Sequence, residues 1–459
     1  MHSTDRASAE PASTPSRAAA PPLAAPPSAA PLSSASPSGA SAPGAPPAAQ
    51  GAGALLEEAG RYAADAVALR RVLHAGPEVG LQVPETQRRV LHALDGLGLD
   101  IRTGERLTSV TGVLRGAREG PTLLLRADMD ALPVHEATER EFASRFPGVM
   151  HACGHDAHMA MLVGAARLLA ARREEIAGQV VFMFQPGEEG CHGARYMIDE
   201  GVLAGSGPDG GEGRPVDAAF ALHVMPGLPS GTLHLRPGPQ MAASDKFRIV
   251  VRGRGGHASA PHGAADPVPA ACELVLALQS AVTRRIPATE PAVLTVSGLS
   301  AGSLPGVIPE TVDLTGTMRT LSAGTREVLH ALLSQVAHGV ASAHGVRAEV
   351  SIGPGYPPTV NDAGFTGFVL RAAAEALGPG SVQVLPEPGM TAEDFSYVLA
   401  EVPGALAFLG ACPPGLAPER APALHSSRCD IDEGALAAGI ACHAAVALGH
   451  LSGRAEAAP

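Results

Sequence analysis

Three short apolar runs in the first half of the chain each end in polar residues. TLLLRADMD ends in Asp128 and Asp130, QVVFMFQPGEEG ends in Glu188 and Glu189, and AAFALHVMP reaches a polar position at His223. Continuous apolar runs bounded by turn signals are typical of buried strands in an α/β sheet. Sites in open α/β sheets form just beyond the carboxyl ends of the strands. The pattern therefore predicts that these polar side chains share one site.

Amphipathic spacing predicts helices on both sides of these strands. Residues 56–73 suit a helix that Gly76-Pro77 terminates, and a second helix is expected from Pro84 to about residue 97. Later in the chain we expect a helix after Asn361-Asp362, a strand at ALAFLG and a closing helix over residues 434–448. Together these elements predict a catalytic domain of α/β class.

A different pattern occupies residues 245–354. KFRIVVRGRG alternates like a strand, residues 265–285 are helical, AVLTVSG and TVDLTGTMRT are strands, residues 325–344 are helical, and RAEVSIG is a last strand. The order β-α-β-β-α-β is that of a ferredoxin-like unit. We therefore expect a discontinuous mixed-sheet domain over residues 53–244 and 355–453, with a ferredoxin-like domain inserted at 245–354.

Composition narrows the class of protein. The first 52 residues are mostly Ala, Pro, Ser and Gly, which bury too little apolar surface to repay ordering, so a disordered tail is expected. A net charge of −12, no Lys/Arg block and no Trp argue against nucleic acid and anionic membranes as partners. No apolar run has transmembrane length. Six scattered cysteines fit a reducing cytoplasm better than a disulfide framework.

Two motifs carry candidate metal ligands. MHACGHDAHM places Cys153 two residues before His155, and a thiolate with an imidazole suits Zn, Mn, Co or Ni. One such pair alone is more often a buried cysteine and a helix-capping histidine. Glu188 and Glu189 follow an apolar strand and a Pro-Gly turn, so one carboxylate can bind a metal while the other hydrogen-bonds a metal-held water.

Two further histidines extend this set. His223 stands at a strand end, and His425 lies in ALHSSRCDIDE. A single histidine is more often structural than a ligand, but here other residues already supply an incomplete set of donors. One Cys, three His and one Glu are too many ligands for a single tetrahedral ion. They suit two ions roughly 3.5–4 Å apart, the usual spacing in two-metal hydrolases.

The order of the motifs resembles a known family. RADMDALP, MHACGHDAHM, QPGEEG, LHVMPG, GRGGHASAPH, GVIPE, GTMRT, MTAEDFS and LHSSRCDIDEG, over roughly residues 55–450, closely resemble the aminoacylase/carboxypeptidase superfamily of two-metal peptidases. Within it, the chain is similar to the amidohydrolase branch of hippurate hydrolases, N-acyl-L-amino acid amidohydrolases and auxin-conjugate hydrolases. The resemblance implies a Zn-peptidase-like catalytic domain that cleaves the amide bond of N-acyl amino acids.

The resemblance also implies a role for individual residues. Glu188 would be the general base that acts on a metal-activated water. Asp130 would orient a ligand imidazole, whereas Asp128 and His158 would lie outside the ligand set. The ligands of the two divalent ions would be Cys153, His155, Glu189, His223 and His425.

By the same resemblance, the inserted domain would be a lid and the contact of a homodimer. His257 matches a histidine that reaches across the dimer to stabilise the oxyanion, and His262 is a second candidate in this motif. Arg319 matches an arginine that holds the substrate carboxylate. The structural alternatives are a turn histidine at 257 and a surface arginine at 319. Gly306 replaces the Asn common in the family, so affinity or substrate preference is expected to differ.

Three other functions compete with this hypothesis. A dipeptidase or aminoacylase of the same superfamily would have to accept a free amino group, and no extra acidic residue stands out for that purpose. A non-catalytic binding or scaffold protein would be expected to lack a ligand or the base, yet every such position is filled. A metal-storage or sensor protein would need neither Glu188 nor a lid.

Overall fold

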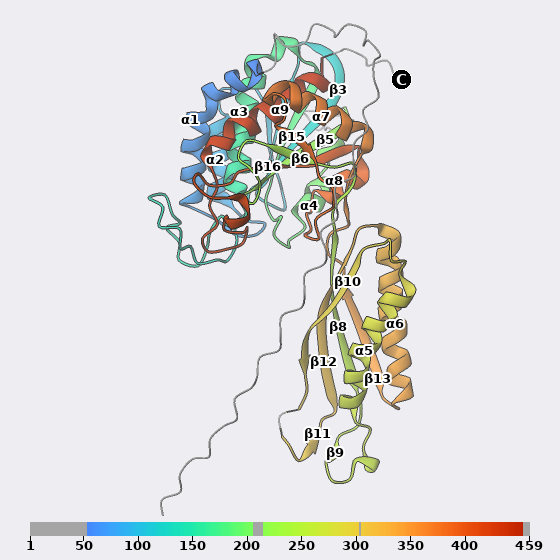
Figure 1. Ribbon diagram of the computed structural model, residues 1–459. Coiled ribbons are helices and arrows are strands. Elements are labelled where there is room, and N and C mark those ends of the chain that lie inside the picture. The colour runs from blue at the N-terminus through green and yellow to red at the C-terminus, as the bar shows by residue number, and fades with distance from the viewer. Residues whose placement is uncertain (1–52, 205–213, 303, 453–459) are drawn as a thin grey trace, which may run out of the picture. The chain divides into compact units, whose positions relative to one another are not determined.

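A large mixed sheet with helices around it forms one part of the fold (Figure 1). The computed structural model describes residues 53–204, 214–302 and 304–452, so the tail expected over residues 1–52 lies outside the described residues. The sheet has eight strands in the order β1-β2-β4-β3-β5-β16-β6-β15. They are β1 (Asp100–Thr103), β2 (Val110–Arg115), β3 (Arg118–Asp128), β4 (Ala177–Gln185), β5 (Ala218–Met225), β6 (Leu233–Leu235), β15 (Val382–Val384) and β16 (Gly404–Gly410).

The three apolar runs predicted as strands are β3, β4 and β5, which confirms the α/β class. With β16 they form the parallel middle of the sheet, while β2 and β6 pair antiparallel to this group. Because the strands run parallel, their carboxyl ends meet at one edge of the sheet. Asp128 ends β3, Gln185 ends β4 and His223 lies near the end of β5. This edge positions the candidate site.

Helices pack against both faces of the sheet. In β3, Leu123 and Leu125 belong to one apolar core and Leu124 to another, because successive side chains point to opposite faces. The helices that contribute to the first core are α1 (Ala54–His74), α2 (Pro84–Leu94), α3 (His155–Ala171), α7 (Ala363–Leu377) and α9 (Leu436–His450). The second core contains side chains of α4 (Gly193–Asp199) and α8 (Ser396–Glu401).

The segment from residue 243 to residue 353 has a sheet and an apolar core of its own. Its four antiparallel strands lie in the order β10-β12-β8-β13, and the core includes Phe247, Leu314 and Leu333. The elements follow the order β8 (Ala243–Arg252), α5 (Pro267–Arg285), β10 (Ala292–Ser300), β12 (Thr311–Thr320), α6 (Ala323–Ala343) and β13 (Arg347–Gly353). Two short pairs are β9 (Gly256–His257) with β11 (Val307–Ile308), and β7 (Gly238–Met241) with β14 (Thr359–Asn361).

Element ends depart from the sequence prediction where glycine changes the backbone. The helix expected to reach about residue 97 ends at Leu94, because Gly96 and Gly98 adopt positive φ angles of 75° and 66°. The closing helix runs to His450 instead of residue 448. Within the described residues, no helix combines the length and apolar character needed to cross a membrane.

Candidate metal centre

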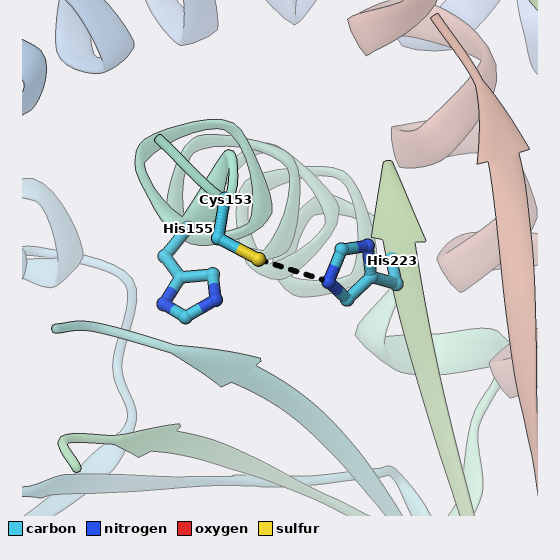
Figure 2. A group of neighbouring side chains, drawn as sticks. All are labelled: Cys153, His155 and His223. Atoms are coloured by element: carbon cyan, nitrogen blue, oxygen red, sulfur yellow. Dashed lines mark hydrogen bonds between the residues drawn. The ribbon is translucent and has the colours of Figure 1, made fainter. Parts of the chain in front are cut away.

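Cys153 and His155 lie at the amino end of α3, and Gly154 between them sets their directions. Gly154 has φ 85°, and a Cβ at this position would stand only 2.3 Å from a methyl group of Val224, so only glycine fits. Figure 2 shows the Cys153 sulfur pointing from this turn toward the His223 ring on β5. The distance from Sγ to His223 Nε2 is 3.4 Å. The helix start and the strand end therefore bring these groups together.

Cys153 also contacts a residue from near the end of the chain. His425 Nε2 lies 3.3 Å from Cys153 Sγ and 3.2 Å from Glu189 Oε1. The backbone of His425 has φ 66°, which is uncommon for a residue with a side chain, and its N–H donates to the Ala152 carbonyl at 2.8 Å. Such strain is typical of functional positions.

The five expected ligands form two overlapping groups. The donor atoms of Cys153, His155 and His223 all lie within 4.8 Å of one another, and so do those of Cys153, Glu189 and His425. Cys153 is common to both groups. A third set within this limit joins His155 to Glu188 and Glu189, so the expected base lies beside the expected ligands.

Asp130 organises the site through its main chain as well as its carboxylate. Its carboxylate accepts from the N–H groups of Glu188 and Glu189 at 2.9 and 3.0 Å. Its carbonyl oxygen lies 2.7 Å from His155 Nδ1, whereas its carboxylate is 3.7 Å from that nitrogen. A carbonyl can only accept, so Nδ1 donates to it. The carbonyl is therefore the Asp130 group nearest to the imidazole, and the role of the Asp130 side chain in orienting a ligand stays a prediction.

His158 and Asp128 hydrogen-bond to each other and to neighbouring protein groups, and Asp128 Oδ2 lies 3.6 Å from His155 Nε2. His158 Nε2 accepts from the Val224 N–H at 2.8 Å, so Nδ1 carries the proton and donates to Asp128 at 2.6 Å. The second carboxylate oxygen of Asp128 accepts from Arg126 at 2.6 Å. This arrangement leaves no ring nitrogen of His158 for a metal.

The electrostatics of the first group fit a divalent cation. Burial raises the pKa of the Cys153 thiol well above its usual range, and Glu189 raises it further. A thiolate here therefore needs a positive charge beside it, which a bound metal ion supplies. Burial lowers the pKa of His223 to about 3, so its imidazole is neutral, as a metal ligand must be. His155 Nε2 is buried and makes no hydrogen bond, so it is free to bind a metal ion. Burial lowers the pKa of His155, but Asp128 and Asp130 raise it to about 10, so metal binding at this nitrogen would displace a proton.

The three candidate residues of the 245–354 segment lie outside both ligand groups. His257 is exposed in β9, and its Nδ1 accepts from the Ser259 N–H at 3.1 Å. His262 is exposed in a short 3-10 helix, Pro261–Gly263. Arg319 is partly buried in β12, makes no hydrogen bond or ion pair with the described residues, and has its pKa lowered by burial.

Comparison with known proteins identifies the family. Residues 124–449 match the model described as Peptidase family M20/M25/M40. The chain belongs to this family. This M20 chain is 39% identical to N-acetyl-L-cysteine deacetylase of Bacillus subtilis (strain 168), over 75% of this chain and 80% of the relative. It is 36% identical to IAA-amino acid hydrolase ILR1-like 4 of Arabidopsis thaliana, over 84% and 85%.

A solved structure supports the same assignment for the M20 chain. A protein of Bacillus subtilis, described as a dinuclear metal binding peptidase from the M20 family, matches with a TM-score of 0.72 and 33% identity, covering 85% of this chain and 99% of that one. The resemblance to the amidohydrolase branch is thereby confirmed. The M20 chain is a hydrolase that acts on amide bonds, and its two groups of candidate ligands agree with the dinuclear metal binding described for that relative.

A buried ion cluster beside Glu188 was not singled out by the sequence analysis of the M20 chain. Arg126, 1% exposed, donates to Glu393 and Asp394 at 2.9 Å each. Carboxylate oxygens of Glu188, Glu393 and Asp394 lie within 4.8 Å of one another. Burial, and next the Glu393 carboxylate, raise the pKa of Glu188 well above its usual range. The motif MTAEDFS contains both acids, but 267 residues separate Arg126 from Glu393, so no local spacing revealed the cluster.

A second buried network in the M20 chain braces the start of α3. Asp156, next to His155, accepts from Arg70 at 3.0 Å and lies 2.8 Å from His74 Nδ1. His74 Nε2 lies 3.2 Å from Glu136. Burial alone would lower the pKa of His74, but Asp156 and Glu136 raise it to about 9.

His74 should therefore make the stability of the M20 chain depend on pH. The folded-state pKa is above the ordinary histidine value of 6.5, so the contribution is complete below pH 6.5 and is lost as pH rises through about 9. The pH-dependent part of the destabilisation by His74→Gln is expected to be about 3 kcal/mol. Urea unfolding of the metal-free protein at pH 6 and pH 10 measures it, with exposed His92→Gln as the control. An equal destabilisation at both pH values would contradict this account.

Proposed function

We propose that this protein hydrolyses the amide bond of N-acyl amino acids. The observation that carries the proposal is the shared sulfur: Cys153 belongs to two groups of ligand atoms, and Glu188 lies beside them. Two ions that share a thiolate, with a carboxylate next to them, form an arrangement suited to the activation of water. The names of the relatives, a deacetylase of N-acetylcysteine and a hydrolase of an amino-acid conjugate, support an N-acyl amino acid as the substrate.

The proposed ligand sets follow from the two groups. Cys153, His155 and His223 would hold one ion, and Cys153, Glu189 and His425 the other. Thiolate, imidazole and carboxylate together suit Mn, Zn, Co or Ni. When bound, the ions polarise the acyl carbonyl and lower the pKa of water.

Glu188 is placed to move the proton. Its side chain is buried, with the residue 7% exposed, and its backbone N–H is fixed by Asp130. The carboxylate takes a proton from the attacking water, whose oxygen adds to the acyl carbon. The same carboxyl then gives the proton to the leaving nitrogen as the C–N bond breaks, releasing a carboxylic acid and a free amino acid.

The 245–354 segment is proposed to be the lid and the dimer contact. Its order β-α-β-β-α-β and the strand order β10-β12-β8-β13 are those of a ferredoxin-like unit. Because His257 Nδ1 accepts from the Ser259 N–H, the neutral ring carries its proton on Nε2. That N–H can donate to an oxyanion, and the exposed ring leaves it free to act in a partner subunit. His262 is the second candidate for this contact.

Arg319 is proposed to hold the substrate carboxylate, because its partly buried guanidinium has no partner in the described chain. Arg319→Lys should raise KM by roughly 10- to 100-fold with a smaller effect on kcat, since a bidentate charged pair is replaced by a point charge. Steady-state kinetics with N-acetyl-L-methionine measure both constants. The control is Arg248→Lys, an exposed arginine paired with Asp313. An unchanged KM would contradict the proposed role of Arg319 in substrate binding.

A substrate screen tests the proposed function directly. Acetyl, benzoyl and indole-acetyl amino acids would be offered after reconstitution with Mn, Zn, Co or Ni, with free dipeptides alongside. We expect hydrolysis of at least one N-acyl series. Preference for dipeptides would favour a dipeptidase, and two bound ions without hydrolysis of any compound would favour a metal-binding protein.

Two smaller features agree with this proposal. All six cysteines are free thiols, which supports a reducing compartment and hence the cytoplasm as the proposed location.

Gly306 has no atom within 4 Å of an added Cβ, so the side chain common at this position would fit. The glycine is therefore not required for packing, and a change of substrate contact is its proposed effect.

A further inference from the structure

We propose that Tyr356 is a positioning residue. It connects the turn of Glu188 and Glu189 to the two chain segments that enter and leave residues 245–354, the proposed lid. The inference rests on the proposed function, because it concerns the placement of the proposed base. Tyr356 follows β13 at the point where the chain leaves the 245–354 segment, and the residue is only 7% exposed.

The Tyr356 hydroxyl closes the catalytic turn. It donates to the Glu188 carbonyl and accepts from the Gly190 N–H at 2.7 Å. Asp130 binds the same turn through the N–H groups of Glu188 and Glu189. Four backbone groups of residues 188–190 therefore bond to two side chains, and the phenol is the one that comes from the far end of the inserted segment.

The backbone around Tyr356 hydrogen-bonds to the segment where the chain enters residues 245–354. The Tyr356 carbonyl accepts from the Ser244 N–H at 3.0 Å, and the Gly355 N–H donates to Asp245 Oδ1 at 2.9 Å. A Cβ on Gly355 would lie 1.6 Å from the Ser244 carbonyl oxygen, so a side chain at 355 is excluded. The chain segments that enter and leave residues 245–354 therefore contact each other directly at Ser244 and Gly355.

A partly buried ion pair anchors this junction to α6. Arg326 donates to both carboxylate oxygens of Asp245, at 2.6 and 2.8 Å, and to the Gly355 carbonyl at 3.1 Å. Asp245 is buried. A displacement of α6 would therefore move Gly355 and Tyr356. The Tyr356 hydroxyl would in turn move the turn of Glu188 and Glu189.

Neighbouring rings fix the Tyr356 side chain. His192 meets the phenol ring edge-on, with centroids 4.9 Å apart and planes at 86°. His192 Nδ1 lies 2.9 Å from the Tyr397 hydroxyl, which also donates to the Gly355 carbonyl at 3.3 Å. The Tyr397 ring also meets the Tyr356 ring edge-on, with centroids 6.1 Å apart. A ring held by two neighbours can position its hydroxyl well, and small misplacements of a catalytic group cost rate.

Tyr356→Phe tests this role because it removes only the hydroxyl. We expect kcat on the best N-acyl substrate of the screen to fall by about 10- to 100-fold, with KM and metal content close to wild type. Hydrogen exchange of the peptide spanning residues 187–193 in the metal-free full chain should accelerate about tenfold, since the Gly190 N–H loses one of its two acceptors and keeps only the Glu188 carbonyl at 2.7 Å. Tyr62→Phe, in α1, is the control for loss of a tyrosine hydroxyl elsewhere.

A double-mutant cycle tests the connection to the lid. Arg326→Gln should also accelerate exchange of the 187–193 peptide, and it should add little in the Tyr356→Phe background, because the hydroxyl carries the connection. Independent, additive effects would show that Tyr356 acts locally and would overturn the coupling.

The remaining outcomes separate this inference from the proposed function. If Tyr356→Phe matches Tyr62→Phe in exchange and in kcat, the positioning role is wrong even when the wild type is active. If the wild type hydrolyses no N-acyl amino acid, the proposed function fails, and the exchange measurements alone decide whether Tyr356 holds the turn. A lower melting temperature with unchanged kcat and unchanged exchange at residues 187–193 would also overturn the proposal.

Discussion

Cys153→Ala should remove both metal ions, and the same change should reduce hydrolysis by at least about 1,000-fold. The sulfur belongs to both ligand groups, lying 3.4 Å from His223 Nε2 and 3.3 Å from His425 Nε2. Its loss would leave two protein ligands in each group, below the three that catalytic metal sites retain. Metal content after reconstitution and dialysis, measured by mass spectrometry, checks this expectation.

Two comparison variants make this result specific. His425→Ala removes a ligand from one group only, so one ion should remain. Cys442→Ala removes a buried thiol of α9, away from the site, and should retain both ions. If Cys153→Ala retained one tightly bound ion, the sulfur would belong to a single site and the shared-ligand assignment would be wrong.

Glu188→Gln is expected to lower kcat by roughly 100- to 10,000-fold while both ions stay bound, because an amide cannot accept the proton from water. The contacts of Glu188 with Asp130 and Tyr356 use main-chain atoms, so the turn keeps its hydrogen bonds in the variant. Single-turnover kinetics and metal analysis on one preparation measure both quantities. Glu174→Gln, at an exposed position, is the control.

The outcome distinguishes the two neighbouring carboxylates. Activity close to wild type would exclude Glu188 as the base. Loss of one ion together with activity would instead make Glu188 a ligand, and would exchange its role with that of Glu189.

The strands that carry the site could be predicted from sequence because their signal is local. Apolar runs ending in Asp128 and Gln185 became β3 and β4, and their parallel pairing places both ends at one edge. The ligand set could be proposed because its cysteine, histidines and glutamate lie in motifs whose order resembles that of a known family. His425 lies 272 residues from Cys153, so only the order of motifs connected the two.

What the sequence did not reveal depends on contacts between distant segments. Arg126 meets Glu393 across 267 residues, and Tyr356 meets Glu188 across 168. Nothing near Tyr356 in the chain distinguishes its hydroxyl from that of any other tyrosine. Asp130 was predicted to contribute to the site. Sequence spacing does not show that its carbonyl accepts from His155 while its carboxylate accepts from Glu188 and Glu189.

The acidic cluster around Arg126 has a consequence for the life of the protein in a cell. One guanidinium faces the carboxylates of Asp128, Glu393 and Asp394, and Glu188 adds a fourth acid close by. Burial raises the pKa of Glu188 and of Asp394 well above the usual range, so the metal-free chain keeps protons on this cluster. Metal ions beside Glu188 that bind only the native state would shift the folding equilibrium toward it. Metal supply would thus act as a maturation checkpoint, because chains that are never loaded would open more often and be removed sooner by proteases.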